Sequence, residues 1–390
     1  MTDAARCANV RIHFLWRSKV ISPFHAISRG KHQLSIGTIP QIVEDVSQNW
    51  LESVLSKGLR LPSFELHPLE ANNSSIARLL FEEDPPVRHV PRSCVLKLCP
   101  AGHDFLAASE INYYNRDYLE LNDAPIPKCY HAVWAGGETS ESKGQSYALF
   151  LEDLSAGYTD NKMIAPTDAH AANLGHALGQ LHAHHWGHDA DPEGRHDLKS
   201  DFGGYLAHVS KGLDPVLHEM GDALDTSSRA RLHSLFDTDA ERILERATAG
   251  NGLTLVHGDP NPTNVLTCTT PRKDRPPLFL IDRQPFEWSM RVWLGASDLV
   301  YAAVPFWSEE HRRELQTTLL QSYHRSLVAN GVENFSMEDL QEDWRICTCM
   351  AAFTAIEWGS DPKSLTGMKW LWEKQLGRAL ILLEDCNVGK

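Results

Sequence analysis

The sequence predicts an α+β fold in two lobes. Its 390 residues exceed the usual size of one domain, and 42% of them are apolar, which is enough for two sizeable cores. Short apolar runs bounded by Pro, Gly, Asn or Asp predict strands, whereas apolar residues recur at helical spacing in much of the chain after residue 166. We therefore expect an N-terminal lobe at 44–152 and a mainly helical C-terminal lobe at 153–390.

The first 43 residues differ in composition from the rest. They hold six Lys or Arg residues and a single acid, Asp3. Arg and His interrupt their apolar runs, so the hydrophobic region of a secretory signal is missing. We interpret residues 1–43 as a basic extension outside the lobes or as the product of a start codon assigned too far upstream. A targeting segment is the alternative.

A strand and a turn stand out in the N-terminal lobe. The run Val95–Leu98 predicts a strand that carries Lys97, and Glu110 follows thirteen residues later. If Lys97 faces inward, Glu110 can pair with its ammonium group, and an ordinary surface ion pair is the alternative. Before this strand, an Asn/Ser turn that ends in Ser74 and Ser75 separates two apolar runs, which predicts a hairpin.

The C-terminal lobe begins with a capped helix. Thr167 and Asp168 follow a proline, and Leu174, Leu178 and Leu181 then recur at spacings of four and three residues. The helix is expected to end near Trp186-Gly187. Further helices are predicted at 225–249, 309–330, 344–358 and 370–383.

One short segment contains the parts of a phosphoryl-transfer site. Asp259 follows a strand predicted at 254–256, Asn264 comes five residues later, and Asp282 ends a strand predicted at 278–281. Phosphoryl transfer needs one carboxylate to orient the attacking hydroxyl and hard oxygen ligands to hold Mg²⁺. We predict that Asp259 is catalytic and that Asn264 and Asp282 are metal ligands. Simple loop carboxylates are the alternative.

These motifs resemble a known family. His257-Gly258-Asp259 with Asn264 and Ile281-Asp282 is similar to the aminoglycoside phosphotransferase and choline kinase superfamily. Three further runs resemble its ecdysteroid-kinase-like branch, namely Leu151–Leu154, Leu178–Trp186 and Ile281–Gln284. The resemblance covers about residues 45 to 390 in loose form. It implies a bilobal protein-kinase-like fold with an N-terminal antiparallel sheet lobe.

The resemblance also implies roles in nucleotide binding. Lys97, held by Glu110, would contact the α and β phosphates of ATP. A glycine-rich loop is missing, and Ser74 and Ser75 would cover the phosphates instead, although an ordinary hairpin turn is nearly as well supported. Glu152 and Leu154 stand where the lobes join, and they are assigned to adenine binding by position only.

Four residues or groups near the motif need separate interpretation. Asp298 corresponds to a family residue that ties down the catalytic loop, and His257 is expected to brace that loop. Arg283 replaces an aromatic residue usual in the family, which puts a cation beside the metal site or turns it outward. The histidines in 182–188 lack Cys or carboxylate partners at complementary spacing, so we do not assign them to zinc.

Composition limits the partners and the compartment. The chain has 37 basic and 51 acidic residues and a net charge of −14, which argues against nucleic acid or an anionic membrane as main partner. The eight cysteines form no Cys-x-x-Cys pair, which indicates free thiols in a reducing, cytoplasmic compartment. No apolar run is long enough to predict a membrane span.

The function predicted is ATP- or GTP-dependent, Mg²⁺-dependent transfer of the γ-phosphate to a hydroxyl of a small molecule. A pseudokinase that binds nucleotide without turnover is the alternative. A protein substrate is less favoured because the segment 284–293 is too short for an activation loop of the protein-kinase kind. Aromatic residues in 205–225, 288–293 and 306–307 either line the acceptor pocket or belong to the lobe core.

Overall fold

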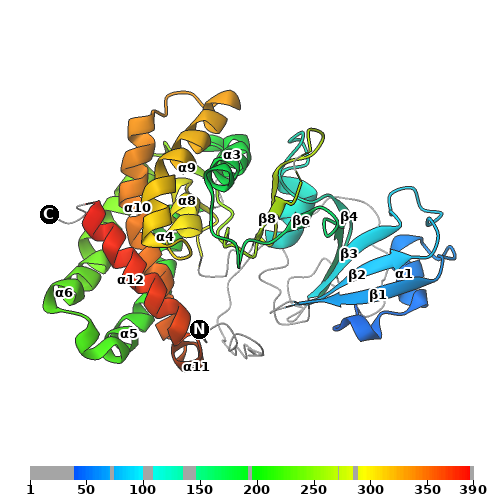
Figure 1. The fold of residues 1–390 in the computed structure, drawn as a ribbon, viewed down its shortest axis with the longest axis horizontal. Helices are drawn as coiled ribbons and strands as arrows, with labels where there is room; N and C mark the ends of the chain where they lie inside the picture. Colours follow the sequence, from blue (N-terminus) through cyan, green and yellow to red (C-terminus); the bar gives the residue numbers. More distant parts are fainter. Residues whose placement is uncertain are drawn as a thin grey trace. The chain divides into compact units, whose positions relative to one another are not determined.

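The computed structural model describes residues 39–70, 74–99, 109–134, 146–191, 196–270, 272–283 and 289–386. Most of the predicted N-terminal extension and the segment 284–288 lie outside these residues. The chain forms two compact units (Figure 1). The first runs through Asn115 and includes Pro127–Leu154, and the second consists of Arg116–Ile126 and the chain from Ser155 onward. The lobe boundaries expected at 43/44 and 152/153 remain predictions.

An antiparallel sheet with the order β1-β2-β3-β5-β4 forms the first unit. The strands are β1 Phe64–Leu69, β2 Ser75–Phe81, β3 Ser93–Cys99, β4 Cys129–Trp134 and β5 Tyr147–Glu152. Lys97 on β3 lies opposite Leu149 on β5. The predicted strand and the two strands around the Asn/Ser turn are therefore present.

Helix α1, Gln48–Leu55, closes the core of this sheet. The Ser47 side chain caps its first turn by accepting the Trp50 N–H. Trp50 stacks on Phe150 of β5 with ring centroids 6.0 Å apart. Ile39 and Val43, which precede the predicted start of the lobe, are buried in the same core.

The second unit is mainly helical. Its helices are α3 Asp168–His184, α4 Leu198–Val209, α5 Leu213–Met220, α6 Thr226–Ser234, α7 Ala240–Thr248, α8 Ala296–Ala303, α9 Glu309–Ala329, α10 Met337–Glu357, α11 Pro362–Gly367 and α12 Lys369–Asp385. Two small antiparallel sheets accompany them (Figure 1). One joins β6 Tyr158–Thr159, β8 Val265–Cys268 and β9 Leu278–Leu280, and the other joins β7 Leu253–Leu255 and β10 Val292–Leu294.

Helices α3 and α9 approach each other closely at two glycines. A Cβ atom at Gly175 would lie 2.4 Å from the Leu319 carbonyl oxygen, and one at Gly179 would lie 2.6 Å from the Ser326 Cβ. The Ser326 hydroxyl also donates to the His176 carbonyl, 2.8 Å away. These contacts hold the middle of α3 against α9.

The predicted fold class is confirmed, with small differences in the helices. Helix α3 starts at Asp168 and is capped by Thr167, but it ends at His184, slightly before the expected Trp186. The helix expected at 225–249 is divided into α6 and α7 by a π-helical turn at Leu235–Asp239. Tyr205 and Trp293, considered for the acceptor pocket, are buried and stack on Phe202.

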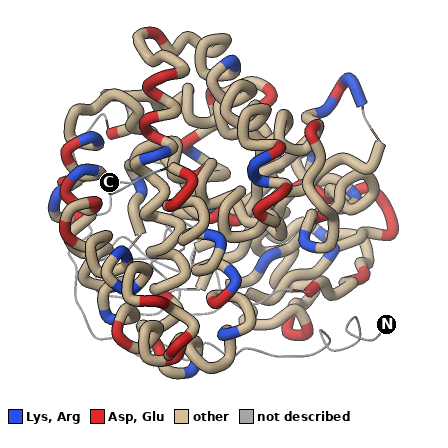
Figure 2. The backbone as a smooth tube through the Cα atoms, turned by 60° about the vertical axis from the view of Figure 1, so that its left-hand side comes forward, with Lys and Arg blue, Asp and Glu red and all other residues tan. Residues whose placement is uncertain are grey.

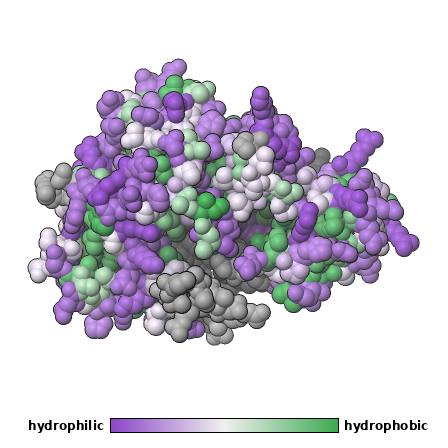
Figure 3. All heavy atoms as spheres, in the orientation of Figure 1, coloured by the Kyte–Doolittle hydropathy of each residue, from purple (hydrophilic) through white to green (hydrophobic). Residues whose placement is uncertain are grey.

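In the views of Figure 2 and Figure 3, charged and apolar residues of the described chain are interspersed with one another. Lys and Arg alternate with Asp and Glu along the described backbone (Figure 2). On the face drawn in Figure 3, apolar residues form small separate areas among hydrophilic ones. Within the described part of the chain, no helix is both long and apolar enough to cross a bilayer.

Candidate active site

The loop that carries the predicted catalytic residue joins β7 to β8 in the second unit. Gly258 has a φ of 81°, a left-handed conformation that glycine adopts without steric cost. The loop begins after β7, which ends at Leu255, and it ends at Asn264, which immediately precedes β8. The His-Gly-Asp sequence thus places Asp259 directly after a turn that only glycine makes easily.

Asp298 on α8 holds this loop by its main chain. Its carboxylate accepts the N–H of His257 at 2.6 Å and the N–H of Gly258 at 2.9 Å. It also bonds the His182 ring, 3.0 Å away. Burial acts to raise the pKa of Asp298, but the bonds from His182 and Gly258 outweigh burial and keep that pKa below its usual value. The predicted tie between Asp298 and the catalytic loop is confirmed.

The sequence analysis missed the role of His182. Its Nδ1 lies 2.8 Å from the Tyr323 hydroxyl, and its carbonyl accepts the Thr254 hydroxyl at 2.9 Å. The His182 side chain therefore links Tyr323 of α9 to Asp298, and the His182 main chain links α3 to β7. The sequence did indicate that His182 is buried, because it lies four residues after Leu178 on the apolar face of α3.

Asp259 is partly buried and accepts three side-chain hydrogen bonds. Its Oδ1 accepts from Asn261 at 2.8 Å and from the Tyr301 hydroxyl at 2.7 Å. Its Oδ2 accepts from the Asn264 amide at 3.0 Å. Burial, with a smaller contribution from the charge of Asp282, raises the pKa of Asp259 to about 7 in spite of these bonds. A carboxyl with this pKa can accept a proton near neutral pH.

Strand pairing brings Asn264 and Asp282 together. Val265 on β8 pairs with Leu280 on β9, and the next residues outward continue this pairing, with the Ile281 N–H donating to the Asn264 carbonyl at 3.0 Å. Asp282 follows with a φ of 63°, an uncommon conformation for a residue other than glycine. Such backbone strain is typical of functional sites and costs on the order of 1–3 kcal/mol.

The donor set fits a magnesium ion bound together with phosphates. The side-chain nitrogen of Asn264 donates to the carboxylate and to the main-chain carbonyl of Asp259. The Oδ1 atom of Asn264 therefore remains as the oxygen that could bind a metal ion. Mg²⁺ usually takes one or two protein oxygens and completes its shell with phosphate and water. Asn264 and Asp282 match that pattern. In the described ranges, no three His, Cys, Asp or Glu side chains could hold a metal ion by themselves.

The first unit contains the buried pair Lys97–Glu110. The Lys97 Nζ lies 2.7 Å from Glu110 Oε1, and the two side chains are 4% and 0% exposed. The Tyr147 hydroxyl donates to the other oxygen of Glu110. The sequence spacing thus correctly paired these two residues, and the surface ion pair considered as an alternative is wrong because both side chains are buried. Their nucleotide roles remain a prediction.

The other residues assigned to nucleotide binding have local partners. The Ser75 hydroxyl accepts the Val43 N–H at 3.0 Å, and Ser74 precedes β2. A Glu152 carboxylate oxygen accepts the Lys128 N–H at 3.3 Å. Leu154 is buried at the last position of the first unit. The proposed roles of Ser74, Ser75, Glu152 and Leu154 remain predictions.

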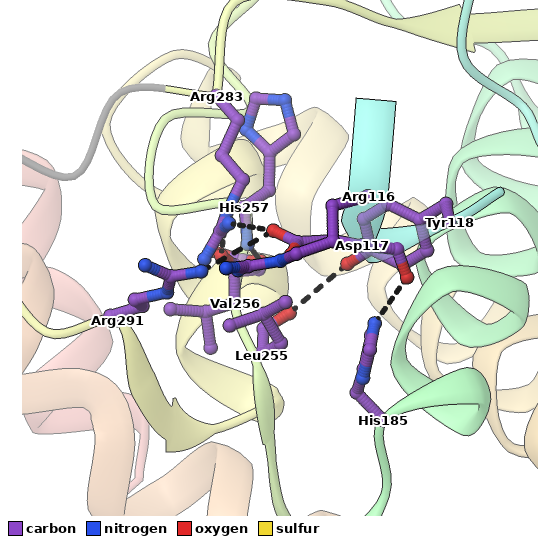
Figure 4. Close-up of polar contacts among 10 residues, drawn as sticks. Arg116, Asp117, Tyr118, His185, Leu255, Val256, His257, Arg283 and Arg291 are labelled. Atoms are coloured by element: carbon purple, nitrogen blue, oxygen red, sulfur yellow. Dashed lines mark hydrogen bonds and ion pairs between the residues drawn. The ribbon is translucent and has the colours of Figure 1, made fainter. Parts of the chain in front are cut away.

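Of the two positions considered for Arg283 from the sequence, the structure contradicts the outward one. Its side chain is fully buried, so it does not turn outward to solvent. Its Nε donates to the Val256 carbonyl at 2.8 Å, and its Nη1 lies 3.1 Å from Asp117 Oδ2 (Figure 4). The guanidinium therefore points into the second unit and ties the residue after Asp282 to the strand that leads into the catalytic loop.

Asp117 is the centre of a cluster of three arginines, Arg116, Arg283 and Arg291. It is bonded by Arg116 at 2.6 Å and by Arg291 at 3.4 Å in addition to Arg283. Figure 4 shows the three guanidinium groups directed at its carboxylate, while the Asp117 carbonyl contacts His185 at 2.6 Å. Burial acts to raise the pKa of Asp117, but the arginines prevail and lower it. The cluster joins the segment 116–126 to the catalytic loop.

Comparison with solved structures places the fold in a known class. The chain is similar to a candidate aminoglycoside phosphotransferase from Ralstonia eutropha, with 12% identity, a TM-score of 0.52 and coverage of 87% of this chain and 97% of that one. It is similar to choline kinase from Cryptosporidium parvum, with 13% identity, a TM-score of 0.50 and coverage of 89% and 92%. It is also similar to ethanolamine kinase from Plasmodium vivax, with 10% identity, a TM-score of 0.50 and coverage of 87% of this chain and 87% of that one. At these identities the likeness shows the fold, which is kinase-like.

The family follows from the sequence. The profile of the Ecdysteroid kinase-like family matches residues 110–333, more than half of the chain. The protein therefore belongs to the Ecdysteroid kinase-like family, as the motifs around Asp259 and Asp282 indicated. No curated protein matches it significantly.

Proposed function

We propose that this protein is an active small-molecule kinase that uses Mg²⁺ with ATP or GTP. The observation that carries the proposal is the joint placement of Asp259, Asn264 and Asp282. One amide side chain, Asn264, bonds the carboxylate of Asp259 and is tied by its main chain to the residue before Asp282. A general base on the β7–β8 loop, with one oxygen ligand just before β8 and another just after β9, is what phosphoryl transfer to a hydroxyl requires.

Asp259 acts on the acceptor. The O–H bond of the acceptor alcohol breaks, and its proton passes to the Asp259 carboxylate. The acceptor oxygen forms a bond to the γ-phosphorus, while the bond from that phosphorus to the bridging oxygen breaks and leaves the nucleoside diphosphate. A pKa of about 7 suits Asp259 to this role at neutral pH.

Other residues serve the nucleotide. Asn264 and Asp282 would hold Mg²⁺, which neutralises phosphate charge when it is bound. Lys97, oriented by Glu110, would contact the α and β phosphates. Ser74 and Ser75 are assigned to the phosphates, and the main chain at Glu152 and Leu154 to the base. The donor is ATP or GTP, and the acceptor is a small molecule with a hydroxyl group.

The compartment proposed is the cytoplasm. Within the described residues no cysteine forms a disulfide, and four of the seven described cysteines are buried. Thiols of this kind are usual in a reducing compartment.

A turnover assay tests the proposal. Purified protein is incubated with Mg²⁺ and either ATP or GTP against a panel of aminoglycosides, choline-like amines, sugars and sterols, and diphosphate release is measured. We expect turnover with at least one acceptor and a loss of about 10²–10⁴-fold in kcat for Asp259→Asn. Asp274→Asn, a surface carboxylate paired with Arg272, serves as control and keeps wild-type activity. Nucleotide binding without turnover would instead support a pseudokinase.

A further inference from the structure

The two oxygens of the Asp259 carboxylate are not equivalent. Oδ1 accepts hydrogen bonds from Asn261 at 2.8 Å and from Tyr301 at 2.7 Å. Oδ2 accepts one from Asn264 at 3.0 Å. A carboxylate oxygen has two lone-pair sites. Both sites of Oδ1 are therefore filled by described residues, whereas one site of Oδ2 remains.

Hydrogen bonds are needed to fix which oxygen faces the acceptor. The last torsion of an Asp side chain is broad, so the rotamer alone does not set the direction of each oxygen. Asn261 and Asn264, which also bond the carboxylate, both belong to the same loop as Asp259. The Tyr301 hydroxyl is the donor that comes from outside the loop, from α8.

Tyr301 is itself well placed to position the carboxylate. It lies three residues after Asp298, close to one turn of α8, so one helix anchors both the main chain of the loop and the side chain of Asp259. The Phe306 ring packs edge-on against the Tyr301 ring with centroids 5.7 Å apart. Burial and the charge of Asp259 raise the pKa of Tyr301 well above its usual value, so the hydroxyl keeps its proton and stays a donor.

We propose that Tyr301 is a positioning residue that holds Oδ1 of Asp259 and thereby directs Oδ2 to the acceptor hydroxyl. The inference rests on the proposed function, because it concerns the same reaction. The acceptor proton goes to Oδ2, and Tyr301 neither gains nor loses a proton. Without the phenol hydroxyl, Oδ1 keeps only Asn261, and the carboxylate can rotate away from the acceptor.

The first test is Tyr301→Phe, which removes the hydroxyl and keeps the ring against Phe306. We expect kcat to fall about 10- to 100-fold, since misplaced catalytic groups lose rates of this order. The KM for the nucleotide should stay within about twofold, because the hydroxyl that is removed bonds Asp259, which serves the acceptor and not the nucleotide. Tyr158→Phe is the matched control. Its hydroxyl donates to the Pro276 carbonyl at 2.7 Å, and its loss should leave kcat unchanged.

The second test does not depend on turnover. Unfolding equilibria are measured for Tyr301→Phe, Asp259→Ala and the double variant. If the hydroxyl bonds the carboxylate, the two effects are non-additive by about tenfold or more in the unfolding equilibrium constant. Additive effects would show that the contact is absent and would overturn the inference.

The outcomes separate the two proposals. Coupling together with a selective loss of kcat supports the positioning role. An active wild type with an unchanged Tyr301→Phe overturns that role alone and leaves the proposed function intact. Coupling without any wild-type turnover overturns the proposed function, and Tyr301 is then only a structural partner of Asp259.

Discussion

The two units hold their buried charges in different ways. In the first unit, Lys97 and Glu110 form one ion pair behind an apolar sheet, with Tyr147 as an additional donor. In the second unit, Asp117 and Asp298 each collect donors from several segments far apart in the sequence. The first arrangement centres on one ion pair, whereas the second is a network of donors around each carboxylate.

The difference has energetic consequences. A buried ion pair repays its desolvation only while both partners remain, and replacing both with neutral groups is often nearly neutral. A network has no such simple replacement, because every donor that is left without its carboxylate adds its own cost. We therefore expect paired substitutions to restore stability in the first unit and to fail in the second.

The largest effect is expected for Lys97→Met. Removal of the ammonium leaves Glu110 as an uncompensated buried carboxylate, which should cost about 3–5 kcal/mol of unfolding free energy. The double variant with Glu110→Gln should recover most of this loss in urea denaturation. Lys128→Met, at an exposed lysine of the same unit, is the control. If the double variant is as unstable as Lys97→Met, Lys97 and Glu110 cannot be replaced together as one ion pair, which would contradict the expectation for the first unit.

A smaller loss of stability is expected for Arg283→Met. The Val256 carbonyl loses its donor, but Asp117 keeps Arg116 and Arg291. We therefore expect the unfolding free energy to fall by about 1–3 kcal/mol. Adding Asp117→Asn should lower stability further, because Arg291 then loses its carboxylate.

Arg272→Met, at a 62% exposed arginine, provides the comparison and should change stability little. Recovery of stability in the double variant of Arg283 and Asp117, measured in the same urea series, would remove the distinction between pair and network.

The effect that is smallest at neutral pH comes from a partly buried histidine and appears only as the pH falls. Burial lowers the pKa of His170 to about 4, so below about pH 6.5 the unfolded chain binds a proton that the folded chain does not. Its contribution to stability is thus complete above pH 6.5 and is lost as the pH falls toward 4. His170→Gln should flatten the decline by at most about 1.4 kcal/mol per pH unit.

Urea denaturation between pH 7 and 4 measures this effect. His176→Gln, at an exposed histidine of the same helix, should follow the wild-type curve. Equal slopes for His170→Gln and wild type would show that His170 does not titrate as expected.

The comparison also explains what could be read from the sequence. Lys97 and Glu110 were found because a short apolar strand marks one residue and local spacing marks the other. Asn264 and Asp282 were proposed because an Asn five residues after Asp259 is followed by a second Asp at the end of a predicted strand, and their metal roles remain predictions. In each case the prediction depends on local pattern and spacing, which a single sequence records.

The remaining contacts could not be read in this way. Arg283 meets Asp117 across a separation of 166 residues, and no local pattern assigns the segment 116–126 to the second unit. His182 and Tyr301 are buried or partly buried polar residues whose partners are set by the packing of α3, α8 and α9. Such partners depend on tertiary structure, which the sequence does not show.

Calorimetric titration of Mg·ATP or Mg·GTP into wild type, Asp282→Ala and Asp259→Asn tests the central claim most directly. If Asp282 holds the metal and Asp259 serves the acceptor, Asp259→Asn binds the nucleotide nearly as wild type does, whereas Asp282→Ala loses Mg²⁺-dependent binding. Thermal denaturation of the same samples confirms that each variant is folded. Unchanged Mg·nucleotide affinity in a folded Asp282→Ala variant would contradict the assignment of the metal site and with it the proposed kinase mechanism.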